Sequence, residues 1–304
     1  MKILAIRHGA LGDVIQALGP FQAIRRHHAE AHLVALTGSP FAELLRASGW
    51  FQEVWVDDRP SLLRLPTLIR TIRRLRDARF AAVYDLQTSS RTAWYFTLMG
   101  APRWSGVAPG CSHPHDNPNR IHMHTVDRQA EQLRIAGIEE VPPPDLAWFG
   151  ADVSRLDLPE NFALLVPGGS RHRPAKRWPY YPALAKALTG RGLTPVVVGA
   201  ADESDLGRAI VAEAPGAIDL TGRTSLLELG GLARQARIAV GNDTGPMHAT
   251  AALGCPSLVL FSEESDPARC APRGEAVGTM RRIHLKDLPV TDVLQEAAGL
   301  ARLP

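Results

Sequence analysis

The sequence has few cysteines and no long apolar run. Its 304 residues include three cysteines, Cys111, Cys255 and Cys270, and no CxxC pair. Such a set argues against a disulfide framework and against a cysteine-built zinc site. The amino-terminal run Met1–Ile6 is too short for a signal-peptide core or a membrane span. We therefore expect a protein of the reducing cytoplasm.

The sequence also lacks a large excess of either positive or negative charge. The chain has 34 Lys and Arg against 31 Asp and Glu, a formal net charge of +3. This weakly basic balance is compatible with an anionic partner such as a phosphate or a membrane surface, but it does not indicate nucleic acid. Hydrophobic residues make up 45% of the chain, and low-complexity tracts are lacking. The composition is that of a folded protein with substantial cores.

The length fits two domains of about 150 residues each. We place them at residues 1–150 and 151–304, because Val141–Asp145 (VPPPD) is a stiff polyproline stretch typical of a linker. The final stretch, Val290–Leu303, is predicted to be helical. The sequence leaves open whether it packs back on the first domain.

Short apolar runs alternate with helical patterns in both halves, which predicts an α/β fold of parallel sheets covered by helices. A helix is predicted over Val14–His28. The expected strands are Ile3–Arg7, His32–Leu36, Val54–Val56 and Ala82–Leu86 in the first half, and Ala163–Val166, Pro195–Val198, Ile238–Val240 and Leu258–Phe261 in the second.

The most informative run is Gly241–His248 (GNDTGPMH), which follows the expected strand Ile238–Val240. It predicts a tight turn and the start of a helix of small residues. Free N–H groups and the positive end of the helix dipole would form an anion site suited to a pyrophosphate. The alternative is a plain N-cap, with Asp243 or Thr244 satisfying the helix and no ligand.

A second run, Val166–Pro179, follows the first strand of the second half. It contains Gly-Gly-Ser and then four cations, and a doubly wound sheet places such a loop beside its ligand. Ser170 is a candidate donor to a phosphate oxygen, and Lys176 is a candidate to neutralise a leaving diphosphate. A solvated basic loop is the alternative.

A third run, Arg7–Ile15 (RHGALGDVI), ends the first strand. Gly9 and Gly12 match the last two glycines of GxGxxG, but Arg7 holds the first position, so a dinucleotide fingerprint is not predicted. Asp13 is either a general base or a helix cap, and the residues alone leave both open.

Three segments occur in a fixed order: Ala10–Asp13 (ALGD), Lys176–Pro179 (KRWP) and Asn242–His248 (NDTGPMH). In that order and placement the chain resembles the ADP-heptose:lipopolysaccharide heptosyltransferases, glycosyltransferase family 9. The similarity covers nearly the whole chain.

The resemblance implies a GT-B fold, in which two Rossmann-like domains face each other across a cleft. Residues 1–150 would bind the acceptor and residues 151–304 the nucleotide sugar. It implies inverting catalysis that needs no metal and no cofactor. Asp13 resembles the catalytic base, and Lys176 resembles the phosphate-binding lysine. The implied loop around the donor diphosphate and sugar consists of Asp243, Thr244, Gly245, Pro246, Met247 and His248.

Two further positions rest on the resemblance. Asp85–Arg91 (DLQTSSR) is similar to a strand end of the family that carries a basic residue toward the acceptor, so Arg91 is a candidate anion contact; otherwise it is a surface helix residue. Asp202 and Glu203 occupy the place of an acidic residue near the ribose, and either could serve.

Two other segments have weaker interpretations. Cys111–Asp116, with His122 and His124, brings imidazoles near a carboxylate, but the spacing fits no standard metal site, and we predict a polar loop without a metal. The basic stretch Leu62–Arg79 predicts an amphipathic helix that starts near Pro66 and packs on the core. Contact with anionic lipid headgroups or acceptor phosphates is the alternative.

We therefore predict a cytoplasmic glycosyltransferase that moves a heptose or related sugar from an ADP-activated donor to a lipopolysaccharide-type acceptor. Peripheral contact with the inner face of the membrane is a further expectation. The alternatives are another GT-B nucleotide-sugar enzyme, such as an epimerase, and a non-catalytic two-domain ligand-binding protein. Epimerisation needs no acceptor, and an exported binding protein would carry a signal sequence.

Overall fold

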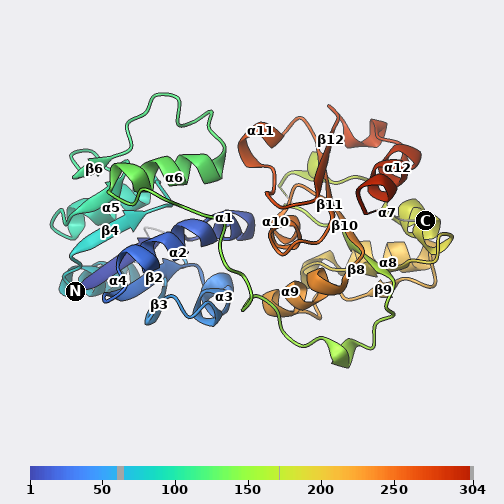
Figure 1. Ribbon diagram of the computed structural model, residues 1–304, viewed down its shortest axis with the longest axis horizontal. Helices are drawn as coiled ribbons and strands as arrows, with labels where there is room; N and C mark the ends of the chain where they lie inside the picture. Colours follow the sequence, from blue (N-terminus) through green and yellow to red (C-terminus); the bar gives the residue numbers. More distant parts are fainter. Residues whose placement is uncertain (60–64, 171, 302–304) are drawn as a thin grey trace. The chain divides into compact units, whose positions relative to one another are not determined.

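The computed structural model describes residues 1–59, 65–170 and 172–301. The chain divides into two compact units, Met1–Trp148 and Phe149–Pro304, and each is built on one six-stranded sheet whose strand pairs are all parallel. Figure 1 colours the first unit blue to green and the second green to red. The predicted α/β class is confirmed.

The sheet of the first unit has the strand order β3-β2-β1-β4-β5-β6. Four of its strands fall where the apolar runs predicted them, whereas β5 and β6 were not predicted. The strands are β1 (Lys2–Ile6), β2 (His32–Thr37), β3 (Glu53–Val56), β4 (Ala82–Asp85), β5 (Trp104–Gly106) and β6 (His113–Pro114).

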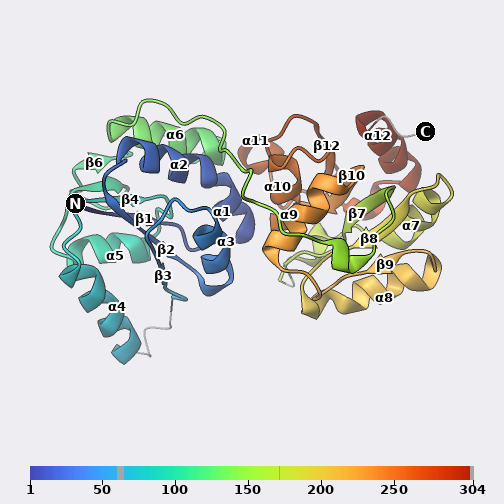
Figure 2. The same ribbon diagram turned by 60° about the horizontal axis from the view of Figure 1, so that its bottom comes forward.

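Helices cover both faces of this sheet. Helices α2 and α6 contact each other, as do α4 and α5, and Figure 2 shows the sheet lying between these two pairs. Because alternate residues of a strand point to opposite faces, a sheet covered on both sides needs continuous apolar runs, and Ile3 to Ile6 are all fully buried. The helices are α1 (Leu11–Gln16), α2 (Leu18–His27), α3 (Ala42–Ala47), α4 (Leu65–Asp77), α5 (Ser90–Leu98) and α6 (Thr125–Ile135).

The single helix predicted over Val14–His28 is wrong. The chain forms α1 and α2, which meet at Ala17. Pro20 lies in the first turn of α2, where it has no N–H to donate to Gln16 and so cannot continue the hydrogen-bond ladder of α1. The break leaves α1 as a short helix directly after β1.

The sheet of the second unit has the strand order β12-β11-β10-β7-β8-β9. Four strands again match predicted runs, and β9 and β12 were not predicted. The strands are β7 (Phe162–Val166), β8 (Thr194–Val197), β9 (Ile218–Asp219), β10 (Ile238–Asn242), β11 (Ser257–Phe261) and β12 (Val277–Arg281).

The last helix packs within the second unit. Helix α12 contacts α7 and strands β10, β11 and β12, and its Val293 and Ala297 belong to the core cluster on that face of the sheet. Residues 302–303 of the predicted terminal helix lie outside the described residues. The helices of this unit are α7 (Tyr181–Thr189), α8 (Ser204–Glu213), α9 (Leu226–Gln235), α10 (Gly245–Ala252), α11 (Pro267–Cys270) and α12 (Val290–Ala301).

The proline-rich run before the second unit lies against α2. The N–H of Asp145 donates to Gln22 Oε1 over 3.0 Å, and Pro142 O lies 3.1 Å from where a Cβ on Gly19 would stand. The first unit therefore includes this run and ends at Trp148.

Each parallel sheet has a switch point, from which later strands of the chain are added on the opposite side of the first strand. In the first unit this switch point lies between β1 and β4, and in the second between β7 and β10. Parallel α/β sheets bind ligands outside the carboxyl ends of their strands at such points. The three motif runs follow β1, β7 and β10, so two of them share one switch point.

Helix α4 confirms the predicted start near Pro66 and the packing of that segment on the core, where Leu75 is buried. Residues 62–64 of the predicted stretch lie outside the described residues. No helix in the described ranges is long and apolar enough to span a bilayer.

Candidate active site

Asn242 joins the two strands at the switch point of the second unit. It is fully buried at the carboxyl end of β10, and its Nδ2 donates to the carbonyls of Pro167 and Gly168, each over 2.9 Å, in the loop after β7. Its Oδ1 accepts from Trp178 N and Tyr181 Oη, each over 3.1 Å. One side chain thus fixes the Gly168 loop and the start of α7. Sequence reasoning did not assign this role.

The amino end of α10 has no side-chain cap. Thr244 is the N-cap residue, but its hydroxyl donates to Asn242 O over 3.2 Å and takes no cap hydrogen bond. The side chain of Asp243 bonds to Lys176. The alternative of a plain N-cap by Asp243 or Thr244 is therefore wrong. In the first turn, Pro246 has no N–H and Met247 N donates to Thr244 O over 3.1 Å, so Gly245 N and the positive end of the dipole are the groups left for an anion.

A lysine lies directly beside this helix start. Lys176, at the end of the short 3-10 turn Pro174–Lys176, places its Nζ 2.6 Å from Asp243 Oδ2. His248 Nε2 lies 3.9 Å from the other oxygen of Asp243. The side chains of Lys176 and Asp243 are only 13% and 10% exposed. Because little water screens a cation that is buried to this extent, it would interact more strongly with a phosphate than an exposed lysine would.

Glu203 lies nearer this loop than Asp202. Its carboxylate accepts from Gly169 N and from Ala200 N, each over 2.9 Å. A Cβ on Gly168 would stand 2.2 Å from Glu203 Oε1, so a larger residue there would displace the Glu203 carboxylate. Asp202 is exposed. Of the two acidic candidates, Glu203 is the one held at the Gly168 loop.

The other described residues of the basic loop differ in their contacts. Arg177 donates to Gly169 O and supports the loop backbone. Ser170 is exposed and remains a candidate phosphate donor. Arg171 lies outside the described residues.

In the first unit, Arg7 joins the switch-point strands and also holds Asp13. Its guanidinium donates to Leu86 O after β4, and its Nη2 lies 2.6 Å from Asp13 Oδ1. The other carboxylate oxygen, Oδ2, accepts from Ala10 N over 3.0 Å. Arg7 is 4% exposed, whereas Asp13 is 44% exposed. Asp13 thus caps α1, as one alternative predicted, and still presents its carboxylate to solvent.

A buried hydrogen-bond chain supports the residues beside Asp13. His8 Nε2 lies 3.0 Å from Asp57 Oδ2, and Tyr95 Oη donates to the same oxygen over 2.6 Å. Burial alone would raise the pKa of Asp57, but the hydrogen bonds from His8 and Tyr95 outweigh it and lower that pKa. The chain links the ends of β1 and β3 to α5. None of these three residues was predicted.

Arg91 is not a plain surface residue. It lies in the first turn of α5, is half-buried, and hydrogen-bonds to Tyr95. Its predicted contact with an acceptor stays a prediction.

Asp85 is fully buried at the end of β4. Its Oδ1 accepts from Gln87 N over 3.1 Å and Thr88 N over 3.0 Å. Its Oδ2 has no hydrogen-bond partner among the described residues. Burial raises the pKa of Asp85 to about 6.

The loop that carries the histidine cluster uses its imidazoles for separate structural contacts. His115 lies 3.1 Å from Glu131 Oε1, His113 accepts from Arg103, and His124 caps α6. In the part of the chain that the structure describes, no three His, Cys, Asp or Glu side chains are grouped to hold a metal.

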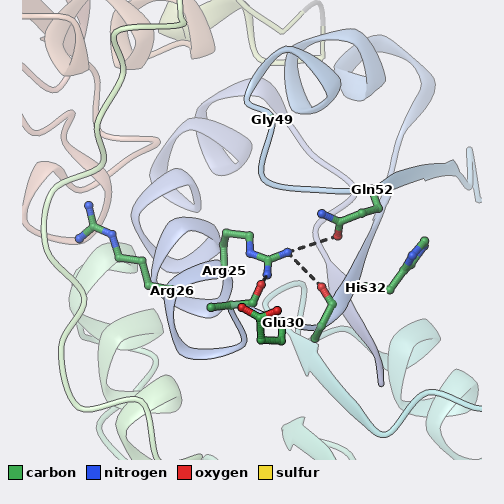
Figure 3. A pocket seen from close by; sticks show the side chains of 8 residues that line it. Arg25, Arg26, Glu30, His32, Gly49 and Gln52 are labelled. Carbon is green, nitrogen blue, oxygen red and sulfur yellow. Dashed lines mark hydrogen bonds between the residues drawn. The ribbon is translucent and has the colours of Figure 1, made fainter.

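An open hollow of about 620 Å³ lies at the amino edge of the first sheet, between the end of α2 and Gln52. Figure 3 shows the side chains that line it, Arg25 among them. The guanidinium donates to Ala31 O over 3.0 Å, to His28 O over 2.7 Å and to Ala29 O. These bonds close the turn from α2 to β2, so the hollow follows from that turn and lies away from the switch-point residues.

Two Rossmann-like units with polar groups gathered at their switch points define the GT-B class of sugar-nucleotide enzymes. The solved structure of Escherichia coli ADP-heptose lipopolysaccharide heptosyltransferase II matches this chain with a TM-score of 0.79 at 22% identity, covering 99% of each chain. The fold class is therefore confirmed.

A family model of glycosyltransferase family 9 (heptosyltransferase) matches residues 68–297. Lipopolysaccharide heptosyltransferase 2 of Salmonella typhimurium is 35% identical over 314 residues, covering 87% of this chain and 84% of that protein. The protein of the same name from Escherichia coli K12 is 26% identical with the same coverage. The chain belongs to glycosyltransferase family 9, and it is a glycosyltransferase of the heptosyltransferase type.

Replacing Asn242 should loosen the second unit. In Asn242→Ala, the carbonyls of Pro167 and Gly168 and the donors of Trp178 and Tyr181 lose their partner. Because buried unsatisfied polar groups are costly, we expect a loss of about 3 kcal/mol or more in the free energy of unfolding, measured by denaturant titration. Asn161→Ala is the matched control, since Asn161 is exposed and its side-chain oxygen accepts from the exposed Arg237. Equal losses in both variants would contradict the assigned role.

The buried carboxyl of Asp85 should make stability depend on pH. Its folded pKa of about 6 lies above that of an unfolded aspartate, about 4. Its stabilising contribution is therefore complete below about pH 4 and is lost as pH rises through 6. The wild type should lose about 3 kcal/mol of unfolding free energy to this group over that interval.

Asp85→Asn cannot ionise and keeps an oxygen for the N–H groups of Gln87 and Thr88. Its unfolding free energy relative to wild type should therefore rise between about pH 4 and pH 7. Asp116→Asn, at an exposed position, controls for the change in net charge. A difference between Asp85→Asn and wild type that stays constant over this range would refute the assignment.

Proposed function

We propose that this chain transfers a heptose from ADP-heptose to a lipopolysaccharide-type acceptor. The observation that carries the proposal is the uncapped start of α10 beside the nearly buried Lys176. The names of the relatives supply the sugar and the acceptor: two are lipopolysaccharide heptosyltransferases, and the matched structure is of an ADP-heptose enzyme.

The second unit would bind the donor. The N–H of Gly245, the positive end of the α10 dipole and the ammonium of Lys176 would bind the diphosphate, with Ser170 and His248 as further contacts. Lys176 already pairs with Asp243, so the diphosphate would share or replace that partner. Glu203, which lies beside the Gly168 loop, would then contact the ribose. The donor loop Asp243–His248 keeps its predicted role.

The first unit would bind the acceptor and supply the base. The acceptor hydroxyl would give its proton to the Asp13 carboxylate while its oxygen attacks the anomeric carbon. The bond from that carbon to the diphosphate oxygen breaks, and the ADP leaves with the electron pair. Attack on the face opposite the leaving group inverts the configuration. Arg7 and Ala10 N fix the direction of the carboxylate.

Arginines near this edge would hold an anionic acceptor. Arg91 is the predicted contact. Arg120 is a second candidate, because its Nε and Nη2 are buried without a hydrogen-bond partner among the described residues. Asp85 exerts a charge interaction on Arg120, which places this guanidinium near the end of β4. Bidentate binding of a carboxylate or phosphate would satisfy both nitrogens.

We also propose that transfer needs no metal and no further cofactor. Lys176 and the α10 dipole supply positive charge at the point where the leaving diphosphate gains negative charge. The expected location is the cytoplasm, with peripheral contact at the inner face of the membrane that carries the acceptor.

The transfer reaction tests the proposed base. Asp13→Asn keeps the shape of the side chain but cannot accept the proton, so transfer from ADP-heptose to a lipopolysaccharide core acceptor should fall by about a hundredfold or more. ADP affinity, measured by calorimetry, should stay near that of wild type and serves as the folding control. Near-normal transfer by this variant would remove Asp13 from the mechanism. Release of a free epimerised sugar by wild type without an acceptor would favour the epimerase alternative.

Donor binding tests Lys176 separately. In Lys176→Ala the diphosphate loses a partly desolvated cation and meets an unpaired Asp243, so ADP affinity should fall by about tenfold or more. Lys186→Ala is the matched control, because Lys186 is exposed on α7 of the same unit. Thermal-shift titrations with ADP, UDP and GDP would measure nucleotide preference. An ADP affinity unchanged by Lys176→Ala would reject this role.

A further inference from the structure

Helices α4 and α5 present a surface of mixed apolar and basic side chains. On α4, Ile69 is 45% exposed, and on α5, Trp94 and Leu98 are 54% and 44% exposed. Arg70, Arg73 and Arg76 are exposed on α4. We call these six residues the α4–α5 face. Exposed apolar side chains rimmed by charged residues mark protein or membrane interaction sites. The α4–α5 face therefore has the character of a binding surface.

The face results from the helical period of both segments. Leu68 and Leu75 turn inward to the core cluster of the first unit, so positions 69, 70, 73 and 76 lie along the lateral and outer sides of α4, away from that cluster. In α5, Tyr95 and Phe96 belong to the same cluster, whereas Trp94 and Leu98 lie one turn apart on the open side. The two helices contact each other and lie side by side on the same face of the sheet in Figure 2.

The arginines of this face point to solvent. Arg70, Arg73 and Arg76 form no hydrogen bond or ion pair with any residue in the described ranges. Arg74, by contrast, stacks over Trp55 with 3.7 Å from its Cζ to the ring centroid. Asp77 is the single acidic residue of α4. The face is therefore strongly cationic on a chain whose formal net charge is only +3.

We propose that the α4–α5 face docks on an anionic lipid bilayer. Trp94, Leu98 and Ile69 enter the headgroup region, and the arginines bind lipid phosphates. Tryptophan favours this interface because its ring is apolar and its N–H stays hydrated. Neither feature suffices alone: without apolar insertion salt would release the protein, and without the arginines the apolar area is too small to hold it.

The position of the face in the fold matches a membrane-anchored acceptor. Helix α4 follows the carboxyl end of β3 and precedes the amino end of β4, so its first turns lie toward the edge of the sheet that carries Arg7 and Asp13. Docking by this face would bring that edge close to the lipid surface. The inference extends the peripheral contact proposed above, but lipid binding itself does not depend on transfer.

Vesicle cosedimentation with the full chain tests the proposal. Wild type should bind vesicles of phosphatidylcholine and phosphatidylglycerol, bind vesicles of phosphatidylcholine alone much more weakly, and bind the anionic vesicles less tightly, without full release, as salt rises. R70Q/R73Q/R76Q should lower partitioning by about a hundredfold, because each cation near an anionic surface contributes about fivefold. A variant with Arg191, Arg223 and Arg237 changed to glutamine removes the same charge from exposed positions of the second unit and should bind like wild type.

Quenching by bromine-labelled lipid tests the apolar part. Trp94 is the tryptophan that is more than half exposed, so quenching should occur in wild type and disappear in Trp94→Ser. Ile283→Ser, at an apolar position of the second unit that is 65% exposed, should change neither quenching nor binding. Absence of binding to anionic vesicles at low salt, or equal binding by R70Q/R73Q/R76Q and wild type, would overturn the proposal. Neither result bears on transfer, which is measured separately with a soluble acceptor.

Discussion

Both units depend on a polar side chain that bonds across the switch point of its sheet. Arg7 donates from the end of β1 to the backbone after β4, and Asn242 donates from the end of β10 to the backbone after β7. Both side chains are nearly or fully buried, so breaking either tie would leave desolvated donors and carbonyls without partners. The strand ends on which the site is built therefore have little freedom to move apart.

Arg7 and Asn242 position groups for different chemistry. Arg7 uses its second terminal nitrogen, Nη2, to orient a carboxylate, so the first unit presents a fixed acceptor of protons. Asn242 instead satisfies the loop after β7 and holds the turn before α10, where the helix start has no side-chain cap and leaves its dipole to an anion. In both cases the polar groups are oriented before a ligand arrives, which is how enzymes reduce the reorganisation that a reaction requires. Arg7 and Asn242 hold these groups in place without needing to touch the substrate.

The predictable parts of this structure are the elements whose pattern lies within one continuous stretch of the sequence. Eight strands follow apolar runs, and the α10 start follows one motif. Strands β5, β6 and β9 are two or three residues long, too short for any periodic pattern, and the break between α1 and α2 depends on where Pro20 falls. Contacts such as Tyr95 to Asp57 and Asn242 to Tyr181 join residues 38 and 61 positions apart. No local pattern reports such pairs, so these roles emerged only from the fold.

Accessibility identifies the proposed base better than pKa perturbation does. Shifted pKa values often mark functional groups, and by that criterion Asp85 and Asp57 would be candidates in the first unit. Yet these carboxylates are 0% and 2% exposed, so an acceptor hydroxyl could reach neither without opening the core. Asp13 is 44% exposed and held at both oxygens. A base must meet its proton within hydrogen-bond distance before its pKa matters, and Asp13, unlike Asp85 and Asp57, satisfies that condition.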